Sequence, residues 1–595
     1  MKTMKRLAAF LLACALLLSW GLSESRRVSG LAHGNNGPVI VMLTLEGDRI
    51  QDITAWPHLE TPGIGVPAVE KVAEAILEQQ SLDVDAVAGA TVSSRATVAA
   101  VENALRKAGV STEKYHETLQ GETIDKTTDV VIVGGGFAGM VSAVRAAQAG
   151  AKVILLERSG MLGGNARFAM GWISGAGFRI QKDLGVEDST EQFYRDIIGF
   201  AGGEANLYPA TAKYYAEQSG PAIDWLQENG AEFKNELNPG IYDPMSVLRV
   251  AWASHMGTSL TGGMQAQLDQ LTAAGQVEIL LGTNAEELLL QDGAVVGVRA
   301  TDTRGDTLLI HAGATILASG GYEASEEKLS AMFEYVARSF MTASGGDTVD
   351  LAVQAGAATH DMDYNTVTGG VLPNDGFYSN IYMNTTYGGL IFVDVNGRRV
   401  FNETGARTLE KSNAWVNAPE NTLYAILTED MLEESDPILS YGNAWTPVRD
   451  TDWAVWKGLC AHGSLIYRAD TLEELSALLG MPALVETVAA YNGYAESGTD
   501  EDFGRTERLL PLKKGPFLAV KTIPYCGWAS GGPMANKNME VLREDGSPIP
   551  GLYVAGEGAG HTLVAGRTPI SGMYLGMCAT FGIDAAEHAA AYALK

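Results

Sequence analysis

The chain contains few cysteines. Only four of its 595 residues are cysteine, Cys14, Cys460, Cys526 and Cys578, and no two of them have Cys-x-x-Cys spacing. Four widely spaced cysteines cannot form a disulfide scaffold, and the missing spacing excludes a c-type haem attachment site, a zinc knuckle and an iron–sulfur cluster signature. Any redox chemistry must therefore use another carrier.

Basic residues are scarce as well. The chain has 42 Lys and Arg against 71 Asp and Glu, for a formal net charge of -29. A field of this sign repels nucleic acid and does not favour an anionic lipid surface. The 46% hydrophobic and 19% charged residues indicate a soluble globular protein. At roughly 100 to 200 residues per domain, its length predicts three or four structural units.

Long apolar runs are missing except at the N-terminus. Three basic residues there precede an apolar run at residues 7–22 and a polar stretch at residues 23–27. This order predicts an export signal at residues 1–29, with a buried helix as the alternative and lipidation of Cys14 as a further option. No later segment has the roughly 18 apolar residues of a membrane span. We therefore expect an extracytoplasmic protein, in the periplasm or at the cell surface, with or without a membrane anchor.

Residues 36–110 predict a small α+β domain. Its expected elements are strands at residues 38–44 and 50–55 and helices at residues 68–79 and 94–108. Between the helices lies Asp-Ala-Val-Ala-Gly-Ala-Thr, ending at Thr91, whose small residues let a bulky group approach the backbone. Ser93 or Ser94 can cap the second helix, and the N-terminus of that helix favours a phosphate.

The order hairpin, helix, D-x-V-x-G-A-T and helix resembles the FMN-binding domain of exported flavoproteins and of sodium-pumping redox complexes. In that family the FMN phosphate is joined covalently to the Thr of an (S/T/A)-G-A-T motif. The resemblance implies that a flavin transferase attaches FMN to Thr91. Ala88 replaces the commoner Ser of the motif, and Ser93 or Ser94 stays open as the acceptor. A helix start without a cofactor is the plain alternative.

A dinucleotide-binding pattern follows a polar linker at residues 111–126. Residues 129–139 read D-V-V-I-V-G-G-G-F-A-G, and a helix and a second strand lead to Glu157. Strand, Gly-x-Gly-x-x-Gly, helix, strand and acidic end occur in the required order. Gly134 permits the turn, Gly136 lets the backbone approach a pyrophosphate, and Gly139 lets the helix lie close to the strand. Glu157 can bind the ribose hydroxyls, whereas a plain βαβ turn leaves it unexplained.

Two later segments favour FAD over NAD. Gly163-Gly164-Asn165 follows Arg158, and I-P-G-L-Y-V-A-G-E ends at Glu557. Together with residues 314–322 they resemble the FAD-binding domain of the fumarate reductase and succinate dehydrogenase flavoprotein family. With the FMN domain in front, the chain resembles exported fumarate, urocanate and related enoate reductases. The residues that the resemblance assigns to non-covalent FAD are Gly134, Gly136, Phe137, Ala138, Gly139, Glu157, Arg158, Gly164, Asn165, Gly556, Glu557, Ser571 and Gly572.

The resemblance implies an α/β fold. A split Rossmann-like FAD-binding domain, residues 127–365 and 521–595, would hold an inserted α+β capping domain at residues 366–520. The small α+β FMN-binding domain would precede both parts.

The resemblance also implies two catalytic arginines. In this family FAD N5 delivers hydride to one alkene carbon, and an Arg that follows an Asn-Glu pair protonates the other. Arg407, after Asn402-Glu403, matches that acid. Because an Arg is a poor acid in water, it must act as a relay; a surface Arg paired with Glu403 is the alternative. Arg567 matches the Arg that forks onto the substrate carboxylate, with neutralisation of the FAD pyrophosphate as its alternative.

Other positions depart from the fumarate enzymes. Trp528 and Thr368 stand where those enzymes carry histidines, and the stretch from Tyr382 replaces their relay residues. These losses argue against fumarate and favour a larger, partly aromatic or apolar substrate with one carboxylate. His561 is either a substrate contact or a surface residue.

We therefore expect an exported reductase of an α,β-unsaturated carboxylate, with no metal. Electrons would enter through FMN from an extracytoplasmic or membrane donor. A ketosteroid-type FAD dehydrogenase and a flavin electron shuttle without substrate chemistry are the alternatives.

Overall fold

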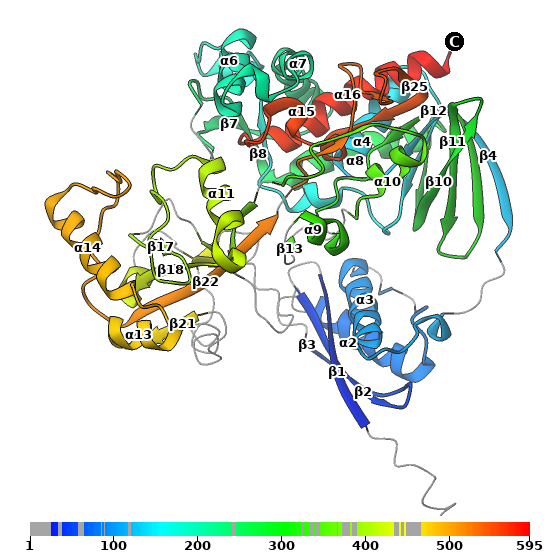
Figure 1. The fold of residues 1–595 in the computed structure, drawn as a ribbon. Helices are drawn as coiled ribbons and strands as arrows, with labels where there is room; N and C mark the ends of the chain where they lie inside the picture. Colours follow the sequence, from blue (N-terminus) through cyan, green and yellow to red (C-terminus); the bar gives the residue numbers. More distant parts are fainter. Residues whose placement is uncertain are drawn as a thin grey trace, which may run out of the picture. The chain divides into compact units, whose positions relative to one another are not determined.

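The structure is a computed structural model in two compact units, one within residues 1–119 and one within residues 120–595 (Figure 1). It describes residues 25–33, 38–56, 65–84, 86–87, 90–116, 121–240, 245–323, 325–332, 338–339, 345–365, 367–371, 381–383, 389–433, 439–441, 446–447, 466–526 and 528–595. Within these ranges no helix is long and apolar enough to cross a membrane.

The first unit packs two helices on an antiparallel sheet of order β1-β2-β3. Its elements are β1 (Ser25–His33), β2 (Pro38–Glu46), β3 (Arg49–Trp56), α2 (Gly65–Gln79), α3 (Thr91–Lys107) and the short η1 (Glu113–Tyr115). Val41, Leu43 and Leu45 alternate along β2 and are fully buried, because a strand turns every second side chain to one face. The predicted hairpin and both predicted helices are present.

Strand β1 was not predicted. It pairs with β2 along its whole length, from Ser25 opposite Glu46 to His33 opposite Pro38. Residues 25–29, which the sequence pattern placed in the export segment, are thus part of the sheet. The reason is that β2 needs a neighbour on the side away from β3, a requirement that local composition does not reveal.

The second unit is built on an eight-stranded sheet. The path runs β10-β11-β12-β4-β5-β9, and β25 joins β12 and β24. These strands are β4 (Thr123–Val133), β5 (Val153–Glu157), β9 (Val277–Leu281), β10 (Thr283–Gln291), β11 (Ala294–Asp302), β12 (Thr307–Leu317), β24 (Glu540–Leu542) and β25 (Pro548–Val554). The pairings of β4 with β5 and β12, of β5 with β9 and of β12 with β25 are parallel.

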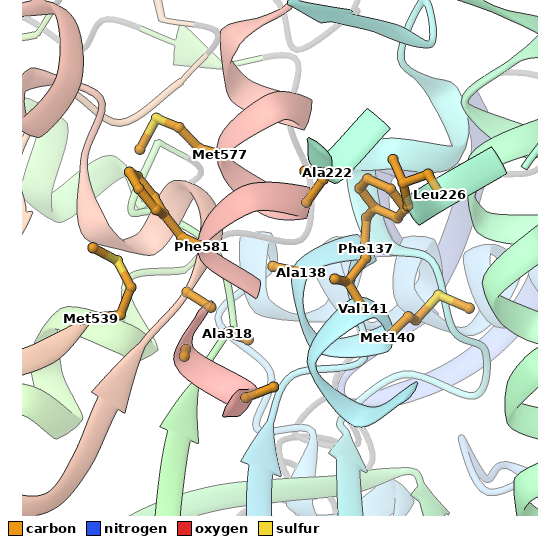
Figure 2. Packing of buried hydrophobic residues seen from close by; sticks show 14 of the residues in the cluster. Phe137, Ala138, Met140, Val141, Ala222, Leu226, Ala318, Met539, Met577 and Phe581 are labelled. Carbon is orange, nitrogen blue, oxygen red and sulfur yellow. The ribbon is translucent and has the colours of Figure 1, made fainter. Parts of the chain in front are cut away.

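Helices α4 (Phe137–Gln148) and α16 (Met573–Ala593) pack against each other beside this sheet. Ser142 of α4 donates a hydrogen bond to the carbonyl of Gly582, 440 residues later. Figure 2 shows Val141 and Phe581 in the same buried cluster, with Leu226 of α7 (Pro209–Glu228) beside Phe137. The C-terminal helix thus covers the helix that follows the glycine-rich turn.

Other elements of this unit surround the sheet. They are β6 (Trp172–Ser174), α5 (Arg179–Asp183), α6 (Thr190–Ala201), η3 (Glu204–Asn206), β7 (Phe233–Asn238), β8 (Val250–Met256), α8 (Gly257–Ala273), α9 (Glu326–Met332), α10 (Asp347–Gln354), β14 (Thr359–His360), β23 (Gly532–Pro533) and α15 (Thr562–Ala565). Strands β6, β8 and β7 form a small antiparallel sheet, and β14 pairs with β23.

The inserted segment has its own sheet and core. Its path runs β17-β18-β22-β15-β16-β19-β20, and β13 and β21 pair with β22. Besides β13 (Arg338–Ser339), which lies before the expected segment at residues 366–520 but joins its sheet, the elements are β15 (Val367–Val371), β16 (Ile381–Met383), β17 (Ile391–Val393), α11 (Thr408–Asn417), β18 (Leu423–Thr428), β19 (Leu439–Tyr441), β20 (Thr446–Pro447), β21 (Ile466–Ala469), α13 (Leu472–Leu479), α14 (Leu484–Ser497) and β22 (Phe517–Cys526). Phe392, Phe401 and Trp415 meet in its core with ring centroids 5.1–5.6 Å apart.

Two elements cross the expected domain boundaries. Residues 123–126 were assigned to the linker, but they begin β4 and pair in register with β12. Residues 521–526 were assigned to the FAD-binding part, but they end β22 and pair with β15 and β18 of the inserted sheet. In both cases a strand is longer than its apolar run, because the partner strand extends the ladder into polar residues.

Candidate active site

The glycine-rich turn joins β4 to α4. Gly134 has a φ of +105°, and Gly136 is the N-cap of α4. A Cβ on Gly139 would overlap the carbonyl oxygen of Gly134, so only glycine lets the helix start this close to the strand. A Cβ on Gly136 would meet no atom within 4 Å. The structure therefore leaves room for an anion beside the N-terminus of α4, while Phe137 and Ala138 are buried in its first turn.

Glu157 ends β5 next to this turn. Its carboxylate accepts hydrogen bonds from the N–H of Gly135 (2.8 Å to Oε2) and of Ser159 (2.7 Å to Oε1). The side chain is half-buried, and each carboxylate oxygen can accept a further hydrogen bond. Glu157 is thus oriented to accept from hydroxyl groups. The neighbouring Arg158 is exposed and forms an ion pair with Asp347 (2.8 Å).

The second glycine segment lies against the first. The N–H of Gly163 donates to the carbonyl of Gly135 (2.8 Å), and Gly163 forms an isolated parallel bridge with Gly136. Gly164 and the half-buried Asn165 begin the next short helix, η2 (Gly164–Phe168). The two segments that the sequence assigned to one cofactor are therefore neighbours.

The C-terminal part adds Gly556 and Glu557 after β25. The N–H of Ala529 donates to Glu557 Oε1 (3.3 Å), and burial together with the nearby Glu323 raises the pKa of the Glu557 carboxyl well above its ordinary value. Glu323 is fully buried and was missed in the sequence. The pattern that could have identified Glu323 is a charged residue directly after a buried strand and a Gly-Gly-Tyr turn.

Helix α16 begins directly after Gly572, its N-cap. Ser571 is buried, and a Cβ on Gly572 would meet the backbone of Ser174 at 2.6 Å. The 21 residues of this helix give its N-terminus a partial positive charge, which favours an anion or a reduced ring nearby.

Arg567 lies between acidic and aromatic side chains. Its guanidinium is 3.9 Å from the carboxylates of Asp361 and Asp363 and stacks over the Tyr364 ring at 4.4 Å from the ring centroid. The side chain is 49% exposed. A substrate carboxylate can therefore reach Arg567.

Asp361 is itself held in place. Its carboxylate lies 3.3 Å from His360 Nδ1, and hydrogen bonding to His360 is the main cause that lowers the pKa of Asp361 below its ordinary value. His360 Nε2 donates to the carbonyl of Ala559 (2.8 Å), and its Nδ1 lies 2.8 Å from Thr562 Oγ1. Asp361 is therefore an ionised, fixed neighbour of Arg567.

Arg407 precedes α11 and is exposed. Its guanidinium donates to the carbonyls of Gly199 and Phe200 (3.1 Å each), at the C-terminal end of α6. The alternative interpretation required an ion pair between Arg407 and Glu403, and Glu403 does not form this pair. Its buried carboxylate instead accepts hydrogen bonds from Arg399 (2.9 and 2.7 Å) and Arg505 (3.0 Å).

The two chain segments that carry the predicted catalytic arginines both contact the C-terminal end of α6. Arg407 binds its last carbonyls, while the neighbour of Arg567, Gly566, packs so closely that a Cβ there would touch the carbonyl of Asn206 and lie 3.2 Å from the Cβ of Ala201. Segments 160 residues apart in the chain are thus gathered around one helix end.

The other predicted substrate residues are placed unequally. Trp528 is nearly buried and packs against the half-buried Tyr574 (5.3 Å between centroids). Thr368 lies in β15 and Tyr382 in β16, two neighbouring strands of the inserted sheet, and their side chains lie outside the described part.

One of the two interpretations of His561 placed it on the surface, and the structure shows that it is buried. Its side chain has no accessible surface, and its ring packs on Tyr574 (5.4 Å). Burial lowers the pKa of His561 to about 4. The ring is therefore neutral and enclosed in this structure.

The first unit places Thr91 as the first residue of α3. The N-cap is Ala90, so the expected capping by Ser93 or Ser94 is wrong: the helix begins before them, and both are buried in its first turn. Ser94 Oγ donates to the carbonyl of Ala90 (2.9 Å) and accepts from the N–H of Val87 (3.0 Å). Ser94 is therefore a poor alternative acceptor for FMN, and Thr91 stands at the helix end that favours a phosphate.

These residues fit a dinucleotide. The room beside Gly136 and the helix N-terminus suit a pyrophosphate, and the fixed Glu157 suits ribose hydroxyls.

Two family models match the chain. Residues 129–574 match the FAD binding domain and residues 34–106 match the FMN-binding domain. The chain is also 30% identical over 592 residues to urocanate reductase of Eggerthella lenta, covering 95% of this chain and 92% of that protein. It belongs to this family of FAD-dependent oxidoreductases. The predicted family, α/β fold class, enzyme class and two flavin-binding domains are thereby confirmed.

Further relatives of this oxidoreductase share parts of its length. Fumarate reductase (cytochrome) of Shewanella frigidimarina is 30% identical over 490 residues, covering 79% of this chain and 78% of the relative. NADH:acrylate oxidoreductase of Vibrio harveyi is 26% identical over 651 residues, covering 95% of this chain, and this chain spans 61% of it. Among solved structures, the open conformation of a flavocytochrome c3 fumarate reductase has a TM-score of 0.61 at 26% identity over 79% of each chain.

Proposed function

We propose that the protein is an exported reductase of α,β-unsaturated carboxylates other than fumarate, with electrons entering through FMN held covalently by Thr91. The contact of Arg407 and of Gly566, the neighbour of Arg567, with the end of α6 carries this proposal, because a proton donor and a carboxylate clamp must both reach one small substrate. The names of the relatives, which reduce urocanate, acrylate or fumarate, support the substrate class.

Arg567 is suited to bind the substrate carboxylate. A guanidinium offers parallel N–H groups to the two oxygens, and the Tyr364 ring beneath it fixes the plane of the fork. Asp361 and Asp363 lie at 3.9 Å, beyond a tight ion pair, so a substrate carboxylate can compete for the guanidinium.

Arg407 is suited to protonate the second alkene carbon. FAD, when bound, supplies hydride to the first carbon. The α6 carbonyls hold the guanidinium of Arg407 at a defined place in the charged form, since the negative end of a helix stabilises a cation. Arg407 must be reprotonated after each proton transfer, and its exposed position gives it access to protons from solvent.

Aromatic residues at the predicted substrate positions favour a substrate larger than fumarate. Trp528 packs against Tyr574 with the two rings tilted by 37°, and Tyr574 lies in the first turn of α16. This pair offers apolar contact in place of the polar clamps of the fumarate enzymes.

We also infer that export removes residues before Ser25, since a later cut would shorten β1. Maturation would then add FMN at Thr91 through a flavin transferase, and an extracytoplasmic or membrane donor would reduce it.

The function is tested by anaerobic reoxidation. Protein reduced with dithionite is mixed with a panel of enoates that includes fumarate, acrylate, urocanate and cinnamates, and flavin absorbance is followed. We expect rapid reoxidation by at least one bulky enoate and little by fumarate. Reoxidation by none of the panel would favour the electron shuttle, and rapid reoxidation by fumarate alone would overturn the substrate class.

A further inference from the structure

The loop that carries Arg407 is fastened by a buried group of four charges. Arg399, Glu403, Asp500 and Arg505 have side-chain exposures of 3% or less. Arg399 binds Glu403 through two nitrogens and Asp500 through the third (2.9 Å), and Arg505 reaches Glu403 Oε2 (3.0 Å). Two positive and two negative charges balance, so the group is neutral as a whole.

Glu403, Asp500 and Arg505 also bind backbone groups around them. Glu403 Oε1 accepts from the N–H of Phe392 (3.2 Å) in β17. Arg505 donates to the carbonyls of Leu390 (2.8 Å) and Glu507 (3.0 Å), and Asp500 accepts from the N–H of Arg505 (3.0 Å). The side chain of Glu403 is therefore locked between the sheet and the loop at residues 500–508.

The few residues from Glu403 to Arg407 have little freedom left. Asn402 Oδ1 accepts from the N–H groups of Thr404 (3.2 Å) and Gly405 (2.6 Å), and its Nδ2 donates to the carbonyl of Phe503 (3.1 Å). The N–H of Arg407 then donates to Glu410 Oε2 (3.0 Å) at the start of α11. The turn is thus tied before and after Arg407.

We propose that Glu403 is a positioning residue for Arg407, placing the guanidinium at the end of α6 through the buried four-charge group. This inference rests on the proposed function, in which Arg407 is the proton donor. Reaction rates respond steeply to the placement of a proton donor, and a displacement of about 1 Å can cost up to ~100-fold. A buried network that fixes a loop is a suitable device for such placement.

The test compares Glu403→Gln with Leu475→Ala. The amide keeps the size of the side chain but removes its charge, whereas Leu475 is an uncharged, fully buried residue of the same inserted core. We expect Glu403→Gln to lower kcat by about 10- to 100-fold with KM changed less than about twofold and FAD content unchanged. Leu475→Ala should lower the melting temperature while kcat stays near that of the parent.

Two further readouts separate positioning from general damage. If proton transfer becomes slower, the solvent deuterium isotope effect on kcat should rise in Glu403→Gln and not in Leu475→Ala. Should Glu403→Gln fail to fold, Asn402→Ala and Asn402→Asp test the same turn, because only the aspartate keeps the acceptor for Gly405. We then expect a several-fold loss of kcat in the alanine variant and recovery in the aspartate variant.

Three outcomes would overturn the inference: full kcat in Glu403→Gln, equal losses of kcat in Glu403→Gln and Leu475→Ala, or equal kcat in the two Asn402 variants. Failure of the proposed function is a separate result. It would appear as an undiminished kcat in Arg407→Ala. If kcat collapses in Arg407→Ala but stays at the parent value in Glu403→Gln, only the positioning role of Glu403 is rejected.

Discussion

Replacement of Gly136 should separate cofactor binding from folding. Its φ of -66° is open to any residue, and a Cβ would meet no atom within 4 Å, so Gly136→Ala should fold. The only cost to the protein is the poorer N-cap, about 0.5–1 kcal/mol. The added methyl group would occupy space that the pyrophosphate needs, and we expect FAD affinity to fall by at least ~100-fold, or about 2.7 kcal/mol.

Gly139→Ala is the matched control, since its methyl group would overlap the carbonyl oxygen of Gly134. Overpacking against the backbone costs about 1–3 kcal/mol or more whether or not FAD is present. FAD titration of the apoproteins by fluorescence, together with their thermal unfolding, measures both effects. Unchanged FAD affinity in Gly136→Ala would refute the placement of the pyrophosphate, and a melting point of apo Gly139→Ala equal to that of the parent would refute the packing argument.

Three further predictions concern single residues. Mass spectrometry of protein made with a flavin transferase should show one FMN addition that Thr91→Ala abolishes and Ser94→Ala retains; the reverse pattern would move the attachment site. Arg407→Ala should lower kcat by at least ~100-fold with FAD bound, whereas Arg567→Ala should also raise KM, because a carboxylate clamp acts in the ground state; steady-state kinetics that show equal KM in both variants would contradict this division. Burial lowers the pKa of His561 to about 4. Between about pH 6.5 and pH 4 the unfolded chain therefore binds a proton at this residue that the native state does not bind, and the free energy of unfolding decreases as the pH is lowered. Chemical denaturation at pH 7 and pH 4 should show the parent losing up to about 3 kcal/mol more than His561→Leu, and equal losses would refute the assignment.

Much of the sheet could be predicted because its strands carry strong local signals. The apolar run before Gly134, the glycine-rich turn and the acidic residue Glu157 predicted the order β4, α4 and β5. The turn is a strong signal because its glycines have steric roles that other residues cannot fill. Strand β1 and the polar start of β4 could not be predicted in this way. Their pairing energy comes from partner strands distant in the sequence, and a single chain does not show which strands will meet.

The site was predictable where a residue acts through a motif and not where it acts through packing. Arg407 and Arg567 stand at motif positions, and the structure brings Arg407 and Gly566, the neighbour of Arg567, to the end of α6. The burial of His561 depends on Tyr574 and Ala529, which approach it from other parts of the chain. Likewise, Glu323 raises the pKa of the Glu557 carboxyl, and because Glu557 lies more than 200 residues later, this effect could not be predicted from the sequence around Glu323.

The contact between α4 and α16 has a consequence for biogenesis. The helix whose N-terminus is suited to the cofactor phosphates forms early in the chain, but one of its faces is covered by α16, the last helix, as the bond between Ser142 and Gly582 illustrates. Strand β25, which completes the sheet beside β12, also comes from the final 50 residues. Such distant closure delays productive folding until the whole chain is available. A nascent chain should therefore be unable to retain FAD, and loss of even the last two turns of α16 should leave a protein that is made but contains no FAD.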